Sequence, residues 1–285
     1  MKVLITGGTG QLGRALIASA PAGVTIVAPP RTQLDLADPA SIAAVIAAEQ
    51  PSHIINCAAH VAVDRAESEP ELAMRLNGTA AGEIAAAAAA CGARLVQIST
   101  DFVFDGEASR PWAPDAATNP LSVYGRTKLA GEQAVRAAHP APLVLRTAWV
   151  YGAHGNNFVR TMLRLMAERP EVRVIADQTG TPTHVTSLAA AIWQLRDASG
   201  TLHWTDAGTA SWYDLAAATQ AIACRLGLLD HAVPVLPIGT ADYPVPARRP
   251  AYSVLDKAAT WAITGPARHW LAELELCLAG MVAAR

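Results

Sequence analysis

Residues 2–13 read Lys2-Val3-Leu4-Ile5-Thr6-Gly7-Gly8-Thr9-Gly10-Gln11-Leu12-Gly13. An apolar, β-rich run passes here into glycines spaced as GxxGxxG and then into a helical pattern. Glycines in a strand-to-helix turn allow a tight turn, close approach of the backbone to a pyrophosphate and close packing of the helix, whose N-terminus offers N–H groups to phosphates. The stretch therefore predicts a dinucleotide site, in which we place Gly7, Gly10, Gln11, Leu12 and Gly13.

Apolar β-rich runs alternate with helical patterns along the rest of the chain. This order predicts βαβ units and a parallel sheet with helices on both faces, the doubly wound Rossmann class of α/β fold. The expected strands are residues 2–6, 24–28, 53–57, 94–99, 143–147 and 202–204. The expected helices are residues 11–20, 39–49, 69–91, 123–138 and 157–168, one that begins at the capping box Ser211-Trp212-Tyr213-Asp214, and a last one over roughly 269–282.

The second half of the chain is richer in turns and prolines, notably in Gln178–Thr183 and Pro234–Pro250. Long irregular segments are uncommon unless they build a binding site. We therefore expect a dinucleotide-binding domain over residues 1–151, to which a later part of the chain, about 186–225, returns. A smaller α/β substrate-binding lobe is expected mainly over residues 152–285.

Composition excludes several classes of protein. The 285 residues carry a formal net charge of -2 without Lys/Arg clusters, which argues against a nucleic-acid partner and for a small molecule. The four cysteines lie far apart and form no ligand pattern, so we predict reduced thiols and no metal site. No signal peptide and no long uninterrupted apolar stretch is apparent, which predicts a cytoplasmic protein that does not enter a membrane.

The choice of nicotinamide cofactor depends on the residues after the second predicted strand. No acidic residue stands there to accept a ribose 2'-hydroxyl, whereas Arg31 can pair with a 2'-phosphate. This favours NADPH, with NADH as the alternative if Arg31 is only a solvated loop charge. Leu34 and Asp35 can edge the adenine, and Asp35 and Leu36 are assigned to the cofactor site. Ala58 and Ala59, at the end of the third strand, let the backbone pass close to the cofactor, although small residues at a strand end are also ordinary packing.

Tyr124 and Lys128 are four residues apart and share one face of a predicted helix. The chain has 5 Tyr and 3 Lys, so about 0.05 such pairs are expected by chance. A phenol with an ordinary pKa of about 10 needs a neighbouring ammonium to donate a proton near neutral pH. Upstream, a predicted strand ends in Thr100 and Asp101, where Thr100 can polarise a substrate carbonyl; an Asx-type turn is the structural alternative for both.

Several segments resemble the dTDP-4-dehydrorhamnose reductase family of extended short-chain dehydrogenases/reductases. The resemblance implies NADPH- or NADH-dependent reduction of the C4 ketone of a nucleotide sugar, dTDP-4-dehydro-L-rhamnose, to dTDP-L-rhamnose. It places the catalytic roles on Thr100, Tyr124 and Lys128, with Asp101 beside the sugar. The segments that carry it are Asn56–Glu67, Ser99–Gly106, Arg146–Gly152, Asn156–Phe158, Asp177–Thr183 and Ala247–Ser253.

Further residues are assigned to the substrate. Trp149, just past a strand end, is expected to stack on the sugar ring or the nicotinamide edge, with a buried core Trp as the alternative. Asn157 and Arg249 are candidates for the diphosphate or the thymidine, because a dianion needs donors and forked cations. Phe102 is also placed at the substrate. The family often has Tyr at this position, so one hydroxyl contact to the sugar is missing here.

Two other functions stay open from the sequence. One is reduction or epimerisation of a different nucleotide sugar, and the other is a non-catalytic regulatory subunit on the same fold, against which the Tyr124 and Lys128 pair argues. Some members of the family dimerise through a metal held by glutamates, one of them in the first helix. The stretch Gly13-Arg14-Ala15-Leu16 has no carboxylate, so we predict no metal-dependent dimer; a homodimer of another kind stays open.

Overall fold

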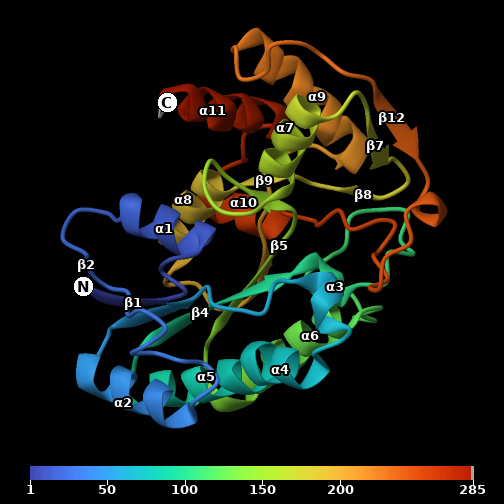
Figure 1. Ribbon diagram of the computed structural model, residues 1–285. Coiled ribbons are helices and arrows are strands. Elements are labelled where there is room, and N and C mark those ends of the chain that lie inside the picture. Colours follow the sequence, from blue (N-terminus) through green and yellow to red (C-terminus); the bar gives the residue numbers. More distant parts are fainter. Residues whose placement is uncertain (284–285) are drawn as a thin grey trace.

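Six parallel strands form the central sheet of the computed structural model, which describes residues 1–283 (Figure 1). Their order in the sheet is β10-β5-β4-β3-β1-β2, and every neighbouring pair is parallel. The predicted doubly wound α/β class is confirmed. The strands are β1 (Lys2–Thr6), β2 (Thr25–Val27), β3 (His53–Asn56), β4 (Arg94–Thr100), β5 (Leu143–Thr147) and β10 (Gly200–His203).

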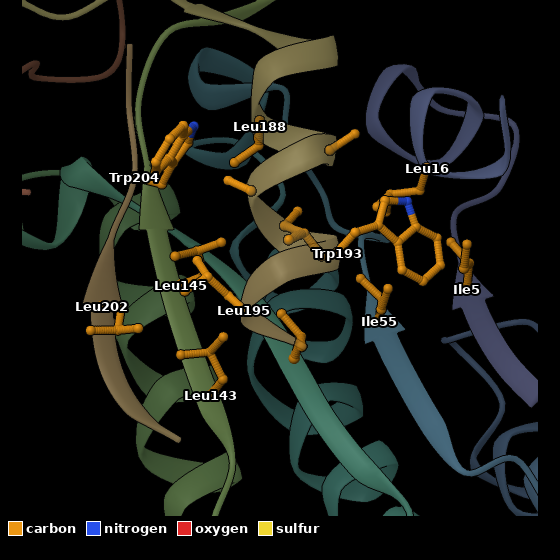
Figure 2. Packing of buried hydrophobic residues seen from close by; sticks show 14 of the residues in the cluster. Ile5, Leu16, Ile55, Leu143, Leu145, Leu188, Trp193, Leu195, Leu202 and Trp204 are labelled. Atoms are coloured by element: carbon orange, nitrogen blue, oxygen red, sulfur yellow. The ribbon is translucent and has the colours of Figure 1, made fainter. Parts of the chain in front are cut away.

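Helices cover both faces of this sheet because successive side chains of a buried strand point to opposite sides. Val3 and Ile5 of β1 pack on one face, and Leu4 between them packs on the other. Figure 2 shows the first of these clusters, in which side chains of the strands meet Leu188 and Trp193. The helices of that face are α1 (Gln11–Ala18), α8 (Val185–Leu195) and α10 (Ala258–Thr264); those of the other face are α2 (Pro39–Glu49), α5 (Ala80–Ala90) and α6 (Val123–Ala138).

The expected helix over residues 69–91 is confirmed over residues 70–90, with a π-helical turn in its middle that was not expected. The segment after α3 (Val63–Ala66) contains α4 (Pro70–Met74), a π-helical turn (Arg75–Thr79) and then α5. The wider turn brings its backbone against α6, where a Cβ added to Gly131 would lie 2.1 Å from the Asn77 carbonyl oxygen. The Asn77 side chain accepts from His60 N at 2.7 Å and donates to Thr127 Oγ1 at 3.1 Å. Asn77 thus ties the loop after β3 to the helix that carries Tyr124.

The remaining elements gather beyond the face of the sheet covered by α1 and α8 (Figure 1). The capping box at Ser211 is confirmed at the start of α9 (Trp212–Arg225). No strand over residues 172–175 or 235–238 and no helix over residues 185–195 was expected, and the structure has two strands and a helix there. No helix within residues 1–283 is long and apolar enough to cross a membrane. The elements are α7 (Phe158–Glu168), α9, α11 (Trp270–Ala283), the parallel pairs β6 (Val150–Tyr151) with β9 (Thr183–His184) and β7 (Val172–Ile175) with β12 (Val235–Ile238), the antiparallel pair β8 (Thr179–Gly180) with β11 (Ala210–Ser211), and the 3-10 turn Thr240–Asp242. Another 3-10 turn, Asp101–Val103, directly follows β4 and packs on α6.

Although β10 lies in the main sheet beside β5, the proposed division at residue 151 stays a prediction.

Candidate active site

A cleft of about 710 Å³ opens at the carboxyl ends of β1, β3, β4 and β5. Ligands of doubly wound sheets bind at this edge because the loops that follow the strands converge there. The cleft is lined by every candidate residue from the sequence except Asn157, namely Gly7, Gly10, Gln11, Leu12, Gly13, Arg31, Asp35, Leu36, Ala58, Ala59, Thr100, Asp101, Phe102, Tyr124, Lys128, Trp149 and Arg249.

The glycine loop forms a cradle that side chains would close. Gly7 has a φ of +66°, and a Cβ added to it would lie 3.0 Å from the backbone of Ala58. A Cβ on Gly13 would lie 2.3 Å from the carbonyl oxygen of Gly7. Both positions require glycine, because these contacts are shorter than van der Waals distance. At Gly7 the φ is also in the left-handed region, which favours glycine. The exposed backbone at the start of α1 fits a pyrophosphate.

The residues after β2 fit a 2'-phosphate better than a free 2'-hydroxyl. Residues 28–30 are Ala-Pro-Pro and offer no carboxylate. The Arg31 side chain is 75% exposed at the rim of the cleft, with its Nε 3.5 Å from Asp35 Oδ1. A guanidinium in this place can fork onto a phosphate dianion.

Tyr124 and Lys128 are set by the first turns of α6. The Ser122 hydroxyl caps the helix by accepting from Gly125 N at 3.1 Å. A Cβ on Gly125 would lie 2.3 Å from Phe102 O, so this turn packs directly on the 3-10 turn that follows β4. Lys128 is buried and donates from Nζ to Ile98 O at 2.6 Å. The predicted helix thus brings Tyr124 and Lys128 to the cleft at the end of β4.

Burial raises the pKa of Tyr124 and lowers the pKa of Lys128. Loss of solvent raises the pKa of the Tyr124 phenol to about 12, against a hydrogen bond with Thr100 that lowers it. Loss of solvent lowers the pKa of the Lys128 ammonium to about 8, against the charge of Glu132, which raises it. At neutral pH the phenol therefore keeps its proton while the lysine is mostly charged. This is the state required of a proton donor and its electrostatic partner.

Thr100 and Asp101 belong to both a turn and the cleft. The Thr100 hydroxyl accepts from Phe102 N at 3.2 Å, which caps the 3-10 turn, and donates to Asp101 Oδ1 at 3.0 Å. Burial raises the pKa of the Asp101 carboxyl to about 6, although hydrogen bonds from Ser253 and Thr100 lower it. Because the Thr100 hydroxyl also hydrogen-bonds with Tyr124, it links the Asp101 carboxyl to the phenol.

Two residues assigned to the substrate are already engaged within the protein. Arg249 lines the cleft, but its guanidinium forks onto Asp64 at 3.0 and 2.7 Å. The hydrogen bond with Arg249 holds the pKa of Asp64 below its usual range. Asn157 caps α7 by accepting from Arg160 N at 3.1 Å, and its amide donates to Gln11 Oε1 at 2.9 Å. Asparagine is a preferred N-cap residue, so its side chain faces the helix and Gln11 rather than the cleft.

A pair of indoles forms another part of the lining. The rings of Trp149 and Trp212 are parallel, with centroids 3.5 Å apart and planes at 5°. Trp149 comes from the turn between β5 and β6, and Trp212 opens α9. Within residues 1–283 no cluster of three or more His, Cys, Asp or Glu side chains could hold a metal ion.

The family model described as the RmlD substrate binding domain matches residues 1–283. The chain belongs to this RmlD family. A relative named dTDP-4-dehydrorhamnose reductase from Salmonella typhimurium is 42% identical, over 90% of this chain and 89% of its own. One named dTDP-4-keto-6-deoxy-D-glucose reductase from Streptomyces niveus is 43% identical, over 95% and 94%. A crystal structure of dTDP-4-dehydrorhamnose reductase from Bacillus anthracis, in complex with NADP, is 36% identical, with a TM-score of 0.91 over 97% of this chain and 98% of that chain.

Trp212 and Asn156 are among the residues lining this RmlD-family cleft that the sequence did not assign to the site. Trp212 was recognised only as part of a capping box, and its place beside Trp149 depends on a contact between distant segments. Asn156 lines the cleft next to the expected Asn157. The capping preference of Asn at the start of α7 was the signal that could have separated the two.

Proposed function

We propose that the protein reduces the C4 ketone of dTDP-4-dehydro-L-rhamnose to dTDP-L-rhamnose with NADPH, or with NADH less well. The matching relatives extend over nearly the whole chain, and one related structure holds NADP. The observation that carries the proposal is the cleft in which a glycine cradle meets Tyr124 and the buried Lys128. A dinucleotide site and a proton donor on one cleft are what a ketone reductase needs.

The proposed mechanism divides the reaction between cofactor and protein. NADPH, when bound, supplies a hydride to the carbonyl carbon. Tyr124 gives its proton to the carbonyl oxygen, and the Lys128 ammonium stabilises the phenolate that remains. Thr100 donates a hydrogen bond from its hydroxyl to the carbonyl oxygen and polarises it. Thr100 and Lys128 are buried, which lowers the local dielectric constant and strengthens their electrostatic effect.

A second candidate is reduction of a different 4-keto-6-deoxy sugar. The relative from Streptomyces niveus, at 43% identity, bears the name of a reductase for dTDP-4-keto-6-deoxy-D-glucose. The two sugars present the same ketone and the same methyl group, and they differ in stereochemistry. The residues of the cleft do not by themselves separate them, so both substrates belong in the test.

The test follows NADPH absorbance with the purified protein and dTDP-4-dehydro-L-rhamnose. We expect stoichiometric oxidation of NADPH, with slower turnover of dTDP-4-keto-6-deoxy-D-glucose and of GDP- and UDP-linked analogues. An epimerase would interconvert the sugar without consuming added NADPH, and a regulatory subunit would do neither. Either result overturns the proposal.

The cytoplasmic location stays a prediction, and a homodimer stays open.

The basic side of the pH profile should be set by Lys128. Its pKa of about 8 lies below the ordinary value because of burial, so the ammonium is lost as pH rises through 8. We expect kcat/KM for NADPH, which reports groups of the free enzyme, to fall about tenfold per pH unit above that value. Lys128→Arg should be slower but should lack this limb, because arginine stays charged. A wild-type profile that is flat to pH 10 would contradict the assignment.

Arg31 is expected to select NADPH over NADH. Hydrogen bonds to a charged group are worth about 1.5–3 kcal/mol. Arg31→Ala should therefore raise the dissociation constant of NADPH about tenfold or more and leave that of NADH nearly unchanged. Quenching of protein fluorescence by each nucleotide measures both dissociation constants. Arg164→Ala is the matched control, since Arg164 is exposed on α7 and does not line the cleft. Equal loss of affinity for both nucleotides would remove Arg31 from contact with the 2'-phosphate.

A further inference from the structure

We propose that Trp212 is a specificity-determining residue of the cleft. Its indole, stacked on Trp149, forms an apolar wall that recognises the C6 methyl group of a 6-deoxyhexose, and Gln178 is the positioning residue that fixes this wall. The inference rests on the proposed function, since it concerns the sugar that the same cleft takes. It assigns roles to Trp212 and to Gln178, neither of which the mechanism uses.

The wall is a stack of two parallel indoles, against which a third aromatic ring is tilted. Trp149 and Trp212 are parallel at 3.5 Å, and the ring of Phe158 lies 4.7 Å from Trp212 at 45°. Trp149 and Trp212 both line the cleft, together with Tyr124 and Thr100. The stack joins the turn after β5, the start of α9 and the start of α7. An extended aromatic surface therefore lines the same cleft as the proton donor.

The conformation of Trp149 is held from two sides. Its φ of +47° is rare for a residue with a side chain, and such strain persists only where the surroundings impose it. A Cβ added to Gly180 would lie 2.6 Å from Trp149 Cε2, so the indole lies directly on a bare backbone. Trp212 contacts the same indole through the stack. Removal of Trp212 would free Trp149 to move.

Gln178 fixes the rotation of the Trp212 ring. Its Oε1 accepts from Trp212 Nε1 at 3.2 Å, and its Nε2 donates to Thr240 Oγ1 at 3.0 Å. Gln178 is 3% exposed, so a turn of the indole away from it would leave a buried amide oxygen unpaired, which costs free energy. The single N–H of Trp212 is thereby used within the protein, and its ring presents only carbon to the cleft.

A carbon wall of this kind discriminates a methyl from a hydroxymethyl group. A methyl group packs on the rings without losing any hydrogen bond. A C6 hydroxyl loses its hydrogen bonds to water and finds no partner on the Trp212 ring. Discrimination between such close analogues in an apolar pocket is worth about 10- to 200-fold. Trp212 therefore sets a preference for 6-deoxy sugars, while Tyr124 and Lys128 perform the same proton transfer on any 4-keto sugar that binds.

The experiment compares two ligands that differ only in the C6 hydroxyl, dTDP-L-rhamnose and dTDP-L-mannose. Calorimetry on the NADP-loaded protein gives both dissociation constants for wild type, Trp212→Leu, Trp212→Phe and Gln178→Met. We expect wild type to bind the rhamnosyl ligand about tenfold or more tightly than the mannosyl ligand. Trp212→Leu should lose most of this preference, and Trp212→Phe should keep part of it. The KM for the sugar substrate should rise about tenfold in Trp212→Leu, with a smaller change in kcat.

Two further measurements separate a local effect from misfolding. The stacked indoles should give an exciton couplet in the far-ultraviolet circular dichroism, which is lost in Trp212→Leu and kept in Trp261→Phe, where an indole outside the cleft is removed. Affinity for NADPH should stay within a few-fold of wild type in every variant. Gln178→Met keeps both indoles, so a lower preference in this variant tests the positioning role without loss of a ring.

The outcomes distinguish this inference from the function on which it rests. If wild type does not oxidise NADPH with dTDP-4-dehydro-L-rhamnose, the proposed function fails. If wild type does so while Trp212→Leu keeps both the C6 preference and the KM, the wall has no role in specificity and the inference fails. The inference also fails if wild type binds dTDP-L-rhamnose and dTDP-L-mannose with equal dissociation constants.

Discussion

Replacing Tyr124 with phenylalanine is expected to lower kcat by about 10²–10⁴-fold, the usual contribution of general acid catalysis. Only the hydroxyl is lost. The phenyl ring can keep its edge-to-face contact with Phe102, whose centroid lies 5.5 Å away at 79°. Since burial raises the pKa of the phenol to about 12, the wild-type group carries its proton across the working pH range. The variant should therefore fold and bind NADPH but lack the proton that the carbonyl oxygen needs.

The measurement is single-turnover oxidation of NADPH, paired with NADPH affinity from fluorescence. Tyr213→Phe serves as the control, because Tyr213 lies on α9 and does not line the cleft; its turnover should match wild type. A Tyr124→Phe enzyme that turns over within a few-fold of wild type would show that another group donates the proton. A large loss of NADPH affinity in the variant would point to disruption of the site instead.

The sequence predicted the parts of the site that depend on local spacing. A glycine turn between a strand and a helix, and a tyrosine and a lysine one helical turn apart, specify their geometry within a few residues of chain. The carboxyl ends of parallel strands meet at one edge, so Thr100 could be placed beside them before the fold was known. The predicted fold class follows from the same local alternation of apolar runs.

The sequence could not predict contacts between segments far apart in the chain. Trp149 and Trp212 are stacked only because β8 and β11 pair and bring the start of α9 to the cleft. The π-helical turn at Asn77 follows from close packing of two helices, which no local propensity encodes. For Asn157 and Arg249 the residue type was informative but the partner was not, because the helix cap engages the side-chain oxygen of Asn157 and a carboxylate engages the guanidinium of Arg249.

Near Lys128 lies a buried charge that the proposed mechanism does not use directly. The Glu132 side chain is fully buried, one helical turn after Lys128. It accepts hydrogen bonds from Arg146 Nε and Nη2, both at 2.8 Å, and from Ser99 Oγ at 2.5 Å. Burial alone would raise the pKa of this carboxyl, but the hydrogen bond and charge of Arg146 outweigh it and hold the pKa below its usual range. The charge of Glu132 also raises the pKa of Lys128.

Removing Glu132 alone should therefore destabilise the protein strongly. Glu132→Gln leaves the Arg146 guanidinium buried without its counter-charge, and loss of one partner of a buried pair costs about 3–5 kcal/mol. Urea unfolding followed by circular dichroism measures the change in free energy of unfolding. Arg136→Ala is the matched control, because Arg136 contacts the same carboxylate from the exposed side at 2.9 Å. An ion pair with an exposed partner is worth about 0–1 kcal/mol, so this control should unfold almost like wild type.

Replacing both partners separates stability from the role of the charge. Glu132→Leu combined with Arg146→Met removes the pair together, which is often neutral or stabilising relative to the buried ions, so the double variant should recover most of the stability lost in Glu132→Gln. Lys128 would then lack the carboxylate that raises its pKa, and the basic limb of the activity profile should move to lower pH than in wild type. A double variant as unstable as Glu132→Gln would contradict the ion-pair account. A stable double variant with an unshifted basic limb would show that Glu132 serves the fold alone and not the protonation of Lys128.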